Sequence, residues 1–179
     1  MDIFVEQLVK VRRGAKEFLI MFGVSAAALL ILGAVIWFAT TFAPLVLLLL
    51  GFGWWWVAKM QVNEYEYSVT NGDIDIDRIR GRSNRLRLVS VRGEKVESLS
   101  RCKVGDNFSR YDRVVYCHAN DKDPETPLWC FTYQSKKNGH TAVIFQPEER
   151  VLKAFMEGLP YLVRREAEKE LAAAGLSEE

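Results

Sequence analysis

The feature that most constrains this chain is a run of 41 consecutive residues, Phe18 to Ala58, without a single Asp, Glu, Lys or Arg. One membrane-spanning helix needs about 20 apolar residues, so the run is long enough for two. Inside it, the stretch FATTFAP at 38–44 carries turn chemistry, because two threonines and a proline interrupt the apolar pattern. The sequence therefore predicts a hairpin of two transmembrane helices, over about 18–39 and 42–58, within a segment 18–58.

Two other interpretations of this run fit less well. A soluble protein would have to bury all 41 uncharged residues in a chain of 179. A cleaved signal peptide has an apolar core of only about 7–15 residues, and no second apolar segment follows it at once.

The cations around the predicted hairpin indicate its orientation. They flank both of its ends and are missing from its turn, so the positive-inside rule places both termini and the C-terminal part on the cytoplasmic side of the membrane. Three consecutive tryptophans beside a lysine fit the aromatic belt at a membrane interface. The predicted membrane-interface anchors are Lys10, Arg12, Arg13, Lys16, Trp54, Trp55, Trp56 and Lys59.

The segment 1–17 precedes the hairpin and admits two interpretations. Its sequence MDIFVEQLVKVRRG puts Phe4, Leu8 and Val11 on one helical face, close to several cations. We expect this cytoplasmic segment to form either a short helix lying on the membrane surface or a simple extension of the first transmembrane helix.

After Lys59 the hydrophobic period changes from helical to alternating, which indicates strands. Asn71-Gly72 is a strong hairpin turn signal between the first two strands, because both residues tolerate positive φ. The seven predicted strands are 61–70, 73–80, 84–91, 94–100, 113–119, 128–134 and 140–146.

Helical periodicity returns after the last strand. PEERVLKAFMEGL, residues 147–159, has an apolar face and acids in its first turn, as an amphipathic helix should. Residues 159–179 become steadily more polar, so we expect a polar helical tail there, with its last dozen residues solvated rather than part of a core. The predicted domain therefore spans 60–158.

Seven meandering antiparallel strands closed by one helix are the outline of a pleckstrin-homology-like (PH-like) barrel. Here the chain resembles small bacterial membrane proteins that pair a two-helix hairpin with one cytoplasmic PH-like domain. The resemblance lies in MDIFVEQLV, EYEYSVTNGDIDIDRI and VIFQPEERVLKAFMEGLP and covers nearly the whole chain. It implies the fold and no established activity.

The stretch DIDIDRIRGRSNRLRL at 73–88 raises the question of a metal site. It begins like a calcium loop, but position six is Arg78 and position twelve is Asn84, where Gly and Glu are required. A hairpin explains it better, because pairing Arg80 with Asn84 places Asp77 opposite Arg87 as a cross-strand ion pair.

The stretch from Arg78 to Lys95 is strongly basic, with seven cations and one acid, Glu94. Three interpretations stay open: a solvated strand face, a surface that docks on anionic lipid, and a site for an acidic protein partner. Nucleic acid is not expected, because stacking aromatics are missing between these cations. The candidate binding residues are Arg78, Arg80, Arg82, Arg85, Arg87, Arg92 and Lys95.

No catalytic or metal motif accompanies the basic hairpin. Cys102, Cys117 and Cys130 form no CxxC, and His118 and His140 lie far apart in the sequence, so we expect buried free thiols, no metal and no cofactor. The sequence thus predicts a non-enzymatic, membrane-anchored PH-like interaction module that binds a protein, a peptide or an anionic lipid surface. A structural subunit of a larger membrane assembly, or a homo-oligomer, is the alternative.

Overall fold

The computed structural model describes residues 3–11, 14–38, 40–61, 63–81, 83–103, 105–119 and 127–173. The chain forms two compact units. The first, which we call the domain unit, comprises Met1–Val11, Glu64–Ile79 and Arg85–Glu179. The second, which we call the helical unit, comprises Arg12–Asn63 and Arg80–Asn84.

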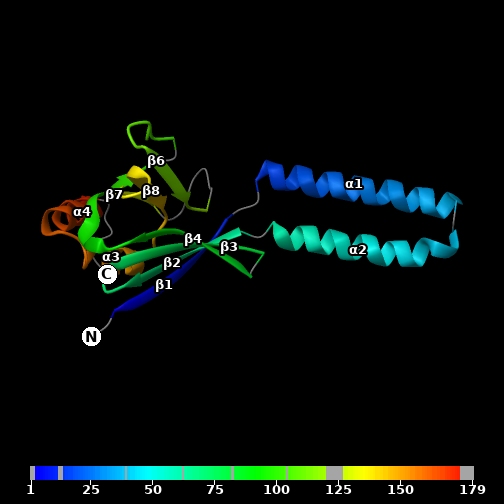
Figure 1. The fold of residues 1–179 in the computed structure, drawn as a ribbon, viewed down its shortest axis with the longest axis horizontal. Helices are drawn as coiled ribbons and strands as arrows, with labels where there is room; N and C mark the ends of the chain where they lie inside the picture. Colours follow the sequence, from blue (N-terminus) through cyan, green and yellow to red (C-terminus); the bar gives the residue numbers. More distant parts are fainter. Residues whose placement is uncertain are drawn as a thin grey trace. The chain divides into compact units, whose positions relative to one another are not determined.

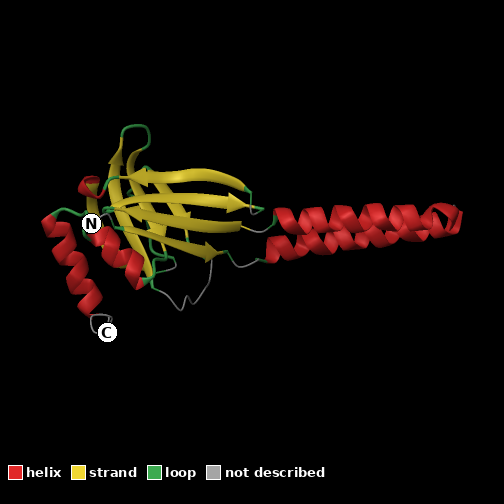
Figure 2. Ribbon diagram, turned by 90° about the horizontal axis from the view of Figure 1, so that it is seen from below, coloured by secondary structure: helices red, strands yellow, loops and turns green. Residues whose placement is uncertain are grey.

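The helical unit contains the two predicted apolar helices. They are α1 (Ala15–Phe38) and α2 (Ala43–Met60), joined by the short 3-10 helix η1 (Thr40–Phe42), and they lie side by side in Figures 1 and 2. Both are long and apolar enough to cross a membrane, and neither has a buried residue. Where they meet, Trp54 Nε1 of α2 donates a hydrogen bond of 3.2 Å to Ser25 Oγ of α1.

The domain unit is built on two four-stranded sheets that enclose its main core (Figure 2). The first sheet has the order β1-β2-β3-β4, with β1 Phe4–Lys10, β2 Asn63–Thr70, β3 Asp73–Arg80 and β4 Asn84–Val91. The second has the order β5-β7-β8-β6, with β5 Val96–Cys102, β7 Leu128–Ser135, β8 Gly139–Phe145 and β6 Arg113–Cys117. All seven predicted strands are therefore present, together with one that was not predicted.

The unpredicted strand is β1, so the expectation of a helix before α1 is wrong for Phe4–Lys10. This segment pairs antiparallel with β2, with Val9 opposite Tyr65. The side chain of Val9 is buried in the main core, whereas Leu8 points outward. The apolar residues of the segment fit both a helical period and a period of two, and pairing with β2 selects the second. The two helices are thus inserted between the first two strands of the domain.

The arrangement of β6 also differs from the prediction of a seven-stranded antiparallel barrel. β6 pairs parallel with β8, with Val115 opposite Val143, because β7 and β8 form an antiparallel hairpin and β6 lies on the far side of β8. The described strands form two sheets and no closed barrel.

Two C-terminal helices complete the domain unit. α3 (Glu149–Met156) is the predicted amphipathic helix and buries one face against the core. The helix predicted after Pro160 is present as α4 (Tyr161–Ala173), but its Val163, Ala167 and Leu171 belong to the same core, so the expectation that the last dozen residues are solvated is wrong at Leu171. These three residues recur every four positions and form a narrow apolar stripe on one face of the helix. The charged residues on its other faces make this stripe hard to recognise in the sequence.

Candidate functional site

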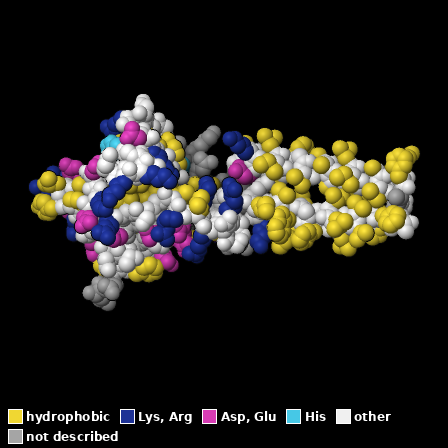
Figure 3. Space-filling model, in the orientation of Figure 1, with side chains coloured by type: hydrophobic (Ala, Val, Ile, Leu, Met, Phe, Trp, Pro, Cys, Tyr) yellow, Lys and Arg dark blue, Asp and Glu magenta, His cyan; other side chains and the backbone are white. Residues whose placement is uncertain are grey.

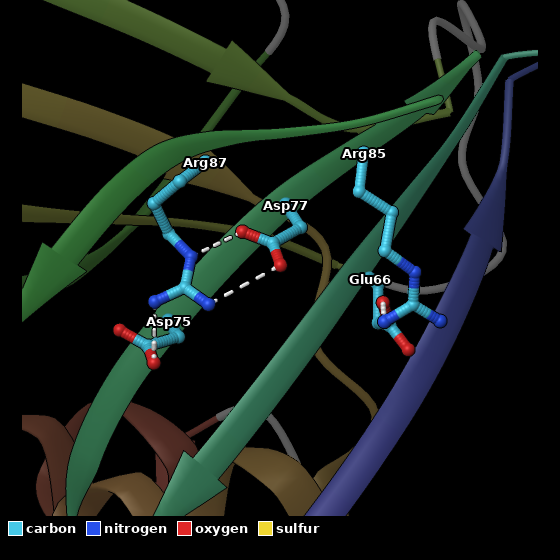
Figure 4. Close-up of polar contacts among 5 residues, drawn as sticks. All are labelled: Glu66, Asp75, Asp77, Arg85 and Arg87. Atoms are coloured by element: carbon cyan, nitrogen blue, oxygen red, sulfur yellow. Dashed lines mark hydrogen bonds and ion pairs between the residues drawn. The ribbon is translucent and has the colours of Figure 1, made fainter. Parts of the chain in front are cut away.

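The alternating aspartates of β3 form an ion-pair network with β4 on the outer face of the first sheet (Figure 4). Ile74 and Ile76 of β3 point into the core, so Asp75 and Asp77 point outward. Arg87 of β4 contacts both: its Nε donates to Asp77, and its Nη1 lies 2.8 Å from Asp75 Oδ2. The hydrogen bond to Asp77 is the main reason that the pKa of Arg87 is raised. The predicted Asp77–Arg87 pair is thus confirmed.

A second arginine of β4 is tied to the same face. Arg85 Nη1 lies 3.0 Å from Glu66 Oε2 of β2, so its side chain reaches across β3 (Figure 4). Glu66 is only 7% exposed, whereas the Arg85 side chain is 63% exposed. The charges of Arg85 and Arg87 therefore balance acids of the first sheet.

The structure separates the other predicted cations of this hairpin. Arg78 lies near Tyr65 and Cys117, where burial raises both pKa values and the positive charge of Arg78 partly opposes that rise. Arg80 belongs to the helical unit, and Arg82 lies outside the described residues. The seven cations are therefore distributed over several surfaces.

The remaining two, Arg92 and Lys95, border a polar groove in the domain unit with a volume of about 600 Å³. A third cation, Lys136, follows β7 and also lines this groove. We call this site the cationic groove. Its polar lining includes Asn71, Ser90 and Ser135.

Two acids also line the cationic groove, so its three cations leave a net charge of +1, and both acids have partners. Asp73 Oδ1 accepts a hydrogen bond of 3.0 Å from the backbone N–H of Gly93, and Asp75 is paired with Arg87. Within the described ranges, Lys95 and Lys136 form no ion pair, and Arg92 has only a 3.6 Å contact with the exposed Glu94. The groove thus keeps positive charge available for an anionic ligand.

Sequence reasoning identified Arg92 and Lys95 but missed Lys136. Lys136 is some forty positions later in the chain, and it reaches the groove because β5 pairs with β7, with Val96 opposite Tyr133. No local pattern in the sequence indicates this cross-strand neighbourhood.

A second cavity, of about 540 Å³, contains two of the three thiols. Cys102 and Cys130 both line it, and burial raises the pKa of Cys102 to about 12 and that of Cys130 to about 11. A thiol with such a pKa is a poor nucleophile at neutral pH, because the thiolate is the reactive form.

The two histidines contact other side chains. His140 Nε2 lies 3.0 Å from Glu97 Oε2, and its ring packs edge-on against Tyr111 at 4.9 Å. Burial lowers the pKa of His118, which packs against Tyr116. Among the residues with described positions, no group of three or more His, Cys, Asp or Glu side chains could hold a metal ion.

The predicted interface anchors fall into four groups. Lys10 lies in β1 of the domain unit, opposite Glu64, and Arg12 and Arg13 lie outside the described residues. Lys16 lies in the first turn of α1. Trp54, Trp55, Trp56 and Lys59 lie in the last two turns of α2, where Lys59 Nζ sits 5.4 Å from the ring centre of Trp55. Figure 3 shows apolar side chains covering both helices, with charged side chains only at the end that carries Lys16 and Lys59.

Comparison with known proteins gives the class of the molecule. Residues 1–165 match a family described as bacterial PH-like domain (DUF6106), so the chain belongs to this family. The resemblance noted from the sequence is thereby confirmed, and the match includes β1 and both apolar helices. No curated protein and no solved structure matches the chain significantly.

Proposed function

We propose that this protein is a membrane-anchored, non-enzymatic interaction module whose cationic groove binds an acidic segment of a protein partner. α1 and α2 anchor the chain in the bacterial cell membrane, and both termini and the domain unit lie in the cytoplasm. The observation that carries the proposal is the cationic groove, which Arg92, Lys95 and Lys136 line together, so that cations outnumber the two acids of the lining.

The membrane anchor is supported by the exposure of α1 and α2. Large apolar side chains cover both helices and no residue of either is buried, although water would disfavour such a surface. In a bilayer these side chains contact lipid tails, so the free-energy cost of exposing them to water does not arise. The cations at one end of the hairpin, and none in its turn, support a cytoplasmic location for the domain unit.

The choice of an acidic protein segment over a lipid surface follows from the ion-pair network. Docking on a flat anionic bilayer needs several available cations on one face. Arg85 and Arg87 balance Glu66, Asp75 and Asp77, so the β3–β4 hairpin has much less free charge than its sequence indicates. A groove with three cations and hydrogen-bonding side chains suits a narrow acidic peptide better.

A direct test measures peptide binding to the full chain purified in detergent. The probe is a fluorescein-labelled octapeptide of Glu and Asp, with a Gln/Asn peptide as the neutral control, and the readout is fluorescence anisotropy across a salt series. We expect binding of the acidic peptide alone, weakening as the salt concentration rises. Lys95→Glu with Lys136→Glu should reduce the affinity by at least about tenfold, since each reversal replaces attraction by repulsion.

The matched control is Lys103→Glu with Lys169→Glu, which makes the same charge change at two exposed positions that do not line the groove. It should bind like the unaltered chain. Equal loss in both double variants would mean that overall charge, and not the groove, attracts the peptide, and the proposal would be wrong.

A structural role in a larger membrane assembly, or in a homo-oligomer, is the second candidate. A Cβ added at Gly23 or Gly33 of α1 would meet nothing within 4 Å. These glycines are therefore not needed for packing against α2 and leave a surface on which another helix could approach closely. Crosslinking in intact membranes separates the two candidates, because a subunit gives a fixed stoichiometric product through its helices.

A further inference from the structure

A small cavity lies at the C-terminal end of α2, within the helical unit. Its volume is about 280 Å³, and its lining includes Trp56, Lys59, Met60, Arg80, Ser83 and Asn84. The last three come from the turn Arg80–Asn84, which belongs to the helical unit. We call this cavity the α2-end pocket.

Close backbone contact builds the α2-end pocket. Gly81 has a φ of +62°, and a Cβ placed on it would lie 3.6 Å from Lys59 O and 3.9 Å from Met60 Cα. The turn therefore lies directly against the last turn of α2. Arg80, on one side of Gly81, and Ser83 and Asn84, on the other, are held beside Lys59 and Trp56.

The lining of this pocket has two chemical halves. Lys59 and Arg80 are cations, none of the described lining residues is an acid, and neither cation forms an ion pair with any described residue. Ser83 and Asn84 add a hydroxyl and an amide that can donate hydrogen bonds. Trp56 and Met60 supply an apolar surface at the end of the apolar helix.

The helix end itself works against an anion, because the C-terminus of a helix carries about half a negative charge. Lys59 stands in that last turn and offsets it, and the guanidinium of Arg80 adds a further full positive charge. The balance at the pocket is therefore positive. Arginine suits phosphate especially, because its planar fork can donate two parallel hydrogen bonds.

We propose that the α2-end pocket binds the phosphate of an anionic phospholipid, with Lys59 and Arg80 holding the phosphate oxygens and Trp56 and Met60 contacting the glycerol and upper acyl region. This inference rests on the proposed membrane anchor. A phospholipid is the source of the phosphate that fits, because the pocket joins cations to an apolar surface at the end of a membrane-length helix. A free phosphate ion would leave the apolar half unused.

Native mass spectrometry of the full chain released from nanodiscs tests the inference. The nanodiscs contain equal amounts of phosphatidylglycerol and phosphatidylcholine, and the readout is the ratio of the two lipids that stay bound. The unaltered chain should retain one phosphatidylglycerol in preference to phosphatidylcholine. Lys59→Gln with Arg80→Gln should reduce that preference by about tenfold, since each cation near an anionic headgroup contributes to it.

Two control variants make the result interpretable. Lys95→Gln with Lys136→Gln removes two cations from the cationic groove and should leave the preference unchanged. Lys59→Arg with Arg80→Lys keeps both charges and should also keep most of it, which separates loss of charge from loss of folding. Equal lipid ratios in the unaltered chain and the Lys59→Gln/Arg80→Gln variant would overturn the inference.

Two further experiments distinguish the ways in which the lipid-binding inference could be wrong. Glycerol phosphate at millimolar concentration should not displace the bound lipid, and displacement would show that the pocket selects free phosphate instead. Alkaline carbonate extraction of membranes tests the anchor by itself. A chain that stays in the membrane without lipid preference refutes only the pocket, whereas a chain released by carbonate refutes the proposed anchor.

Discussion

Glu66 is a buried carboxylate on the outer face of the first sheet, and the partly exposed Arg85 is its ion-pair partner. A buried charge that loses its partner costs more than an exposed one, because neither water nor another side chain replaces the lost interaction. A solvated or membrane-docking arginine hairpin would instead tolerate the loss of Arg85. The stability of the protein distinguishes these two roles.

We predict that Arg85→Gln lowers the free energy of unfolding by about 1–2 kcal/mol, because it leaves Glu66 buried without a cation. Adding Glu66→Gln should restore most of that loss, since two neutral amides can hydrogen-bond to each other. Urea unfolding of the full chain in detergent measures both. A single variant as stable as the unaltered chain would show that the Glu66–Arg85 pair is not structural.

The thiols of Cys102 and Cys130 yield a prediction about reactivity. Burial raises their pKa values to about 12 and about 11, so at pH 8 only about one thiol in a thousand or fewer is ionised. Iodoacetamide should therefore label the folded protein slowly at pH 8, faster as the pH approaches 11, and rapidly in denaturant. Fast labelling at pH 7 in the folded state, followed by peptide mass spectrometry, would contradict the assignment of these thiols as unreactive.

Three glycines meet where the β2–β3 turn, the end of β4 and the end of α3 come together. A Cβ at Gly158 would lie 2.6 Å from Gly72 Cα, and one at Gly93 would lie 2.6 Å from Gly158 O. Neither distance is possible without backbone movement. The contact fixes the end of α3 against turns that border the cationic groove.

Gly158→Ala should therefore lower the free energy of unfolding by about 1–3 kcal/mol, the usual cost of overpacking. Gly53→Ala in α2 is the control, because its added Cβ meets nothing within 4 Å. Thermal unfolding of both variants measures the difference. Similar midpoints for the two would mean that the glycine contact is not tight.

At the scale of single elements, local signals were enough for the β2–β3 and β3–β4 hairpins. Asn71-Gly72 supplies positive φ in the first turn, at 51° and 83°, as its sequence indicates. The helix α3 likewise carries its own apolar face. Such elements can be predicted because the residues that determine them are close together in the chain.

The elements that could not be predicted depend on distant partners. β1 is a strand only because β2 lies beside it, more than fifty residues later in the chain. β6 was predicted as a strand, but its parallel pairing was not, because β8 lies between it and β7 in the sheet. Neither partner leaves a signal within the segment itself, so periodicity alone was ambiguous.

The placement of β1 gives a prediction in which two neighbouring residues behave oppositely. Val9→Ser should lower the free energy of unfolding by about 2 kcal/mol, because Val9 is 8% exposed, whereas Leu8→Ser should change it by less than about 0.5 kcal/mol, because Leu8 is 57% exposed. Urea unfolding provides the comparison. A helix lying on the membrane would reverse the order, because Leu8 would then be the buried residue.

At the scale of the whole molecule, the two helices interrupt the domain between β1 and β2. The domain unit therefore uses residues from both sides of the helices. A fragment that begins after α2 lacks β1 and its contacts, including the hydrogen bond of 3.1 Å from Gln7 Nε2 to Gln146 O. Binding experiments thus need the full chain.

The candidate site was only partly predictable from the sequence for the same reason. The apolar run identified the two long helices, and charge alternation identified the Asp77–Arg87 pair. The cations along 78–95 suggested one continuous basic surface. The sequence did not indicate that Glu66 balances Arg85, because Glu66 lies on another strand. Lys136, which also lines the cationic groove, lies in the turn between β7 and β8 of the second sheet.

The central claim is that the cationic groove of a membrane-anchored chain holds an acidic protein segment. Its most direct test is photocrosslinking in intact membranes from a photoreactive residue at Ser135, which lines the groove. The account predicts one discrete crosslinked protein that disappears in the Lys95→Glu/Lys136→Glu variant and persists in the Lys103→Glu/Lys169→Glu variant. A crosslinking pattern that is the same in both variants would contradict it.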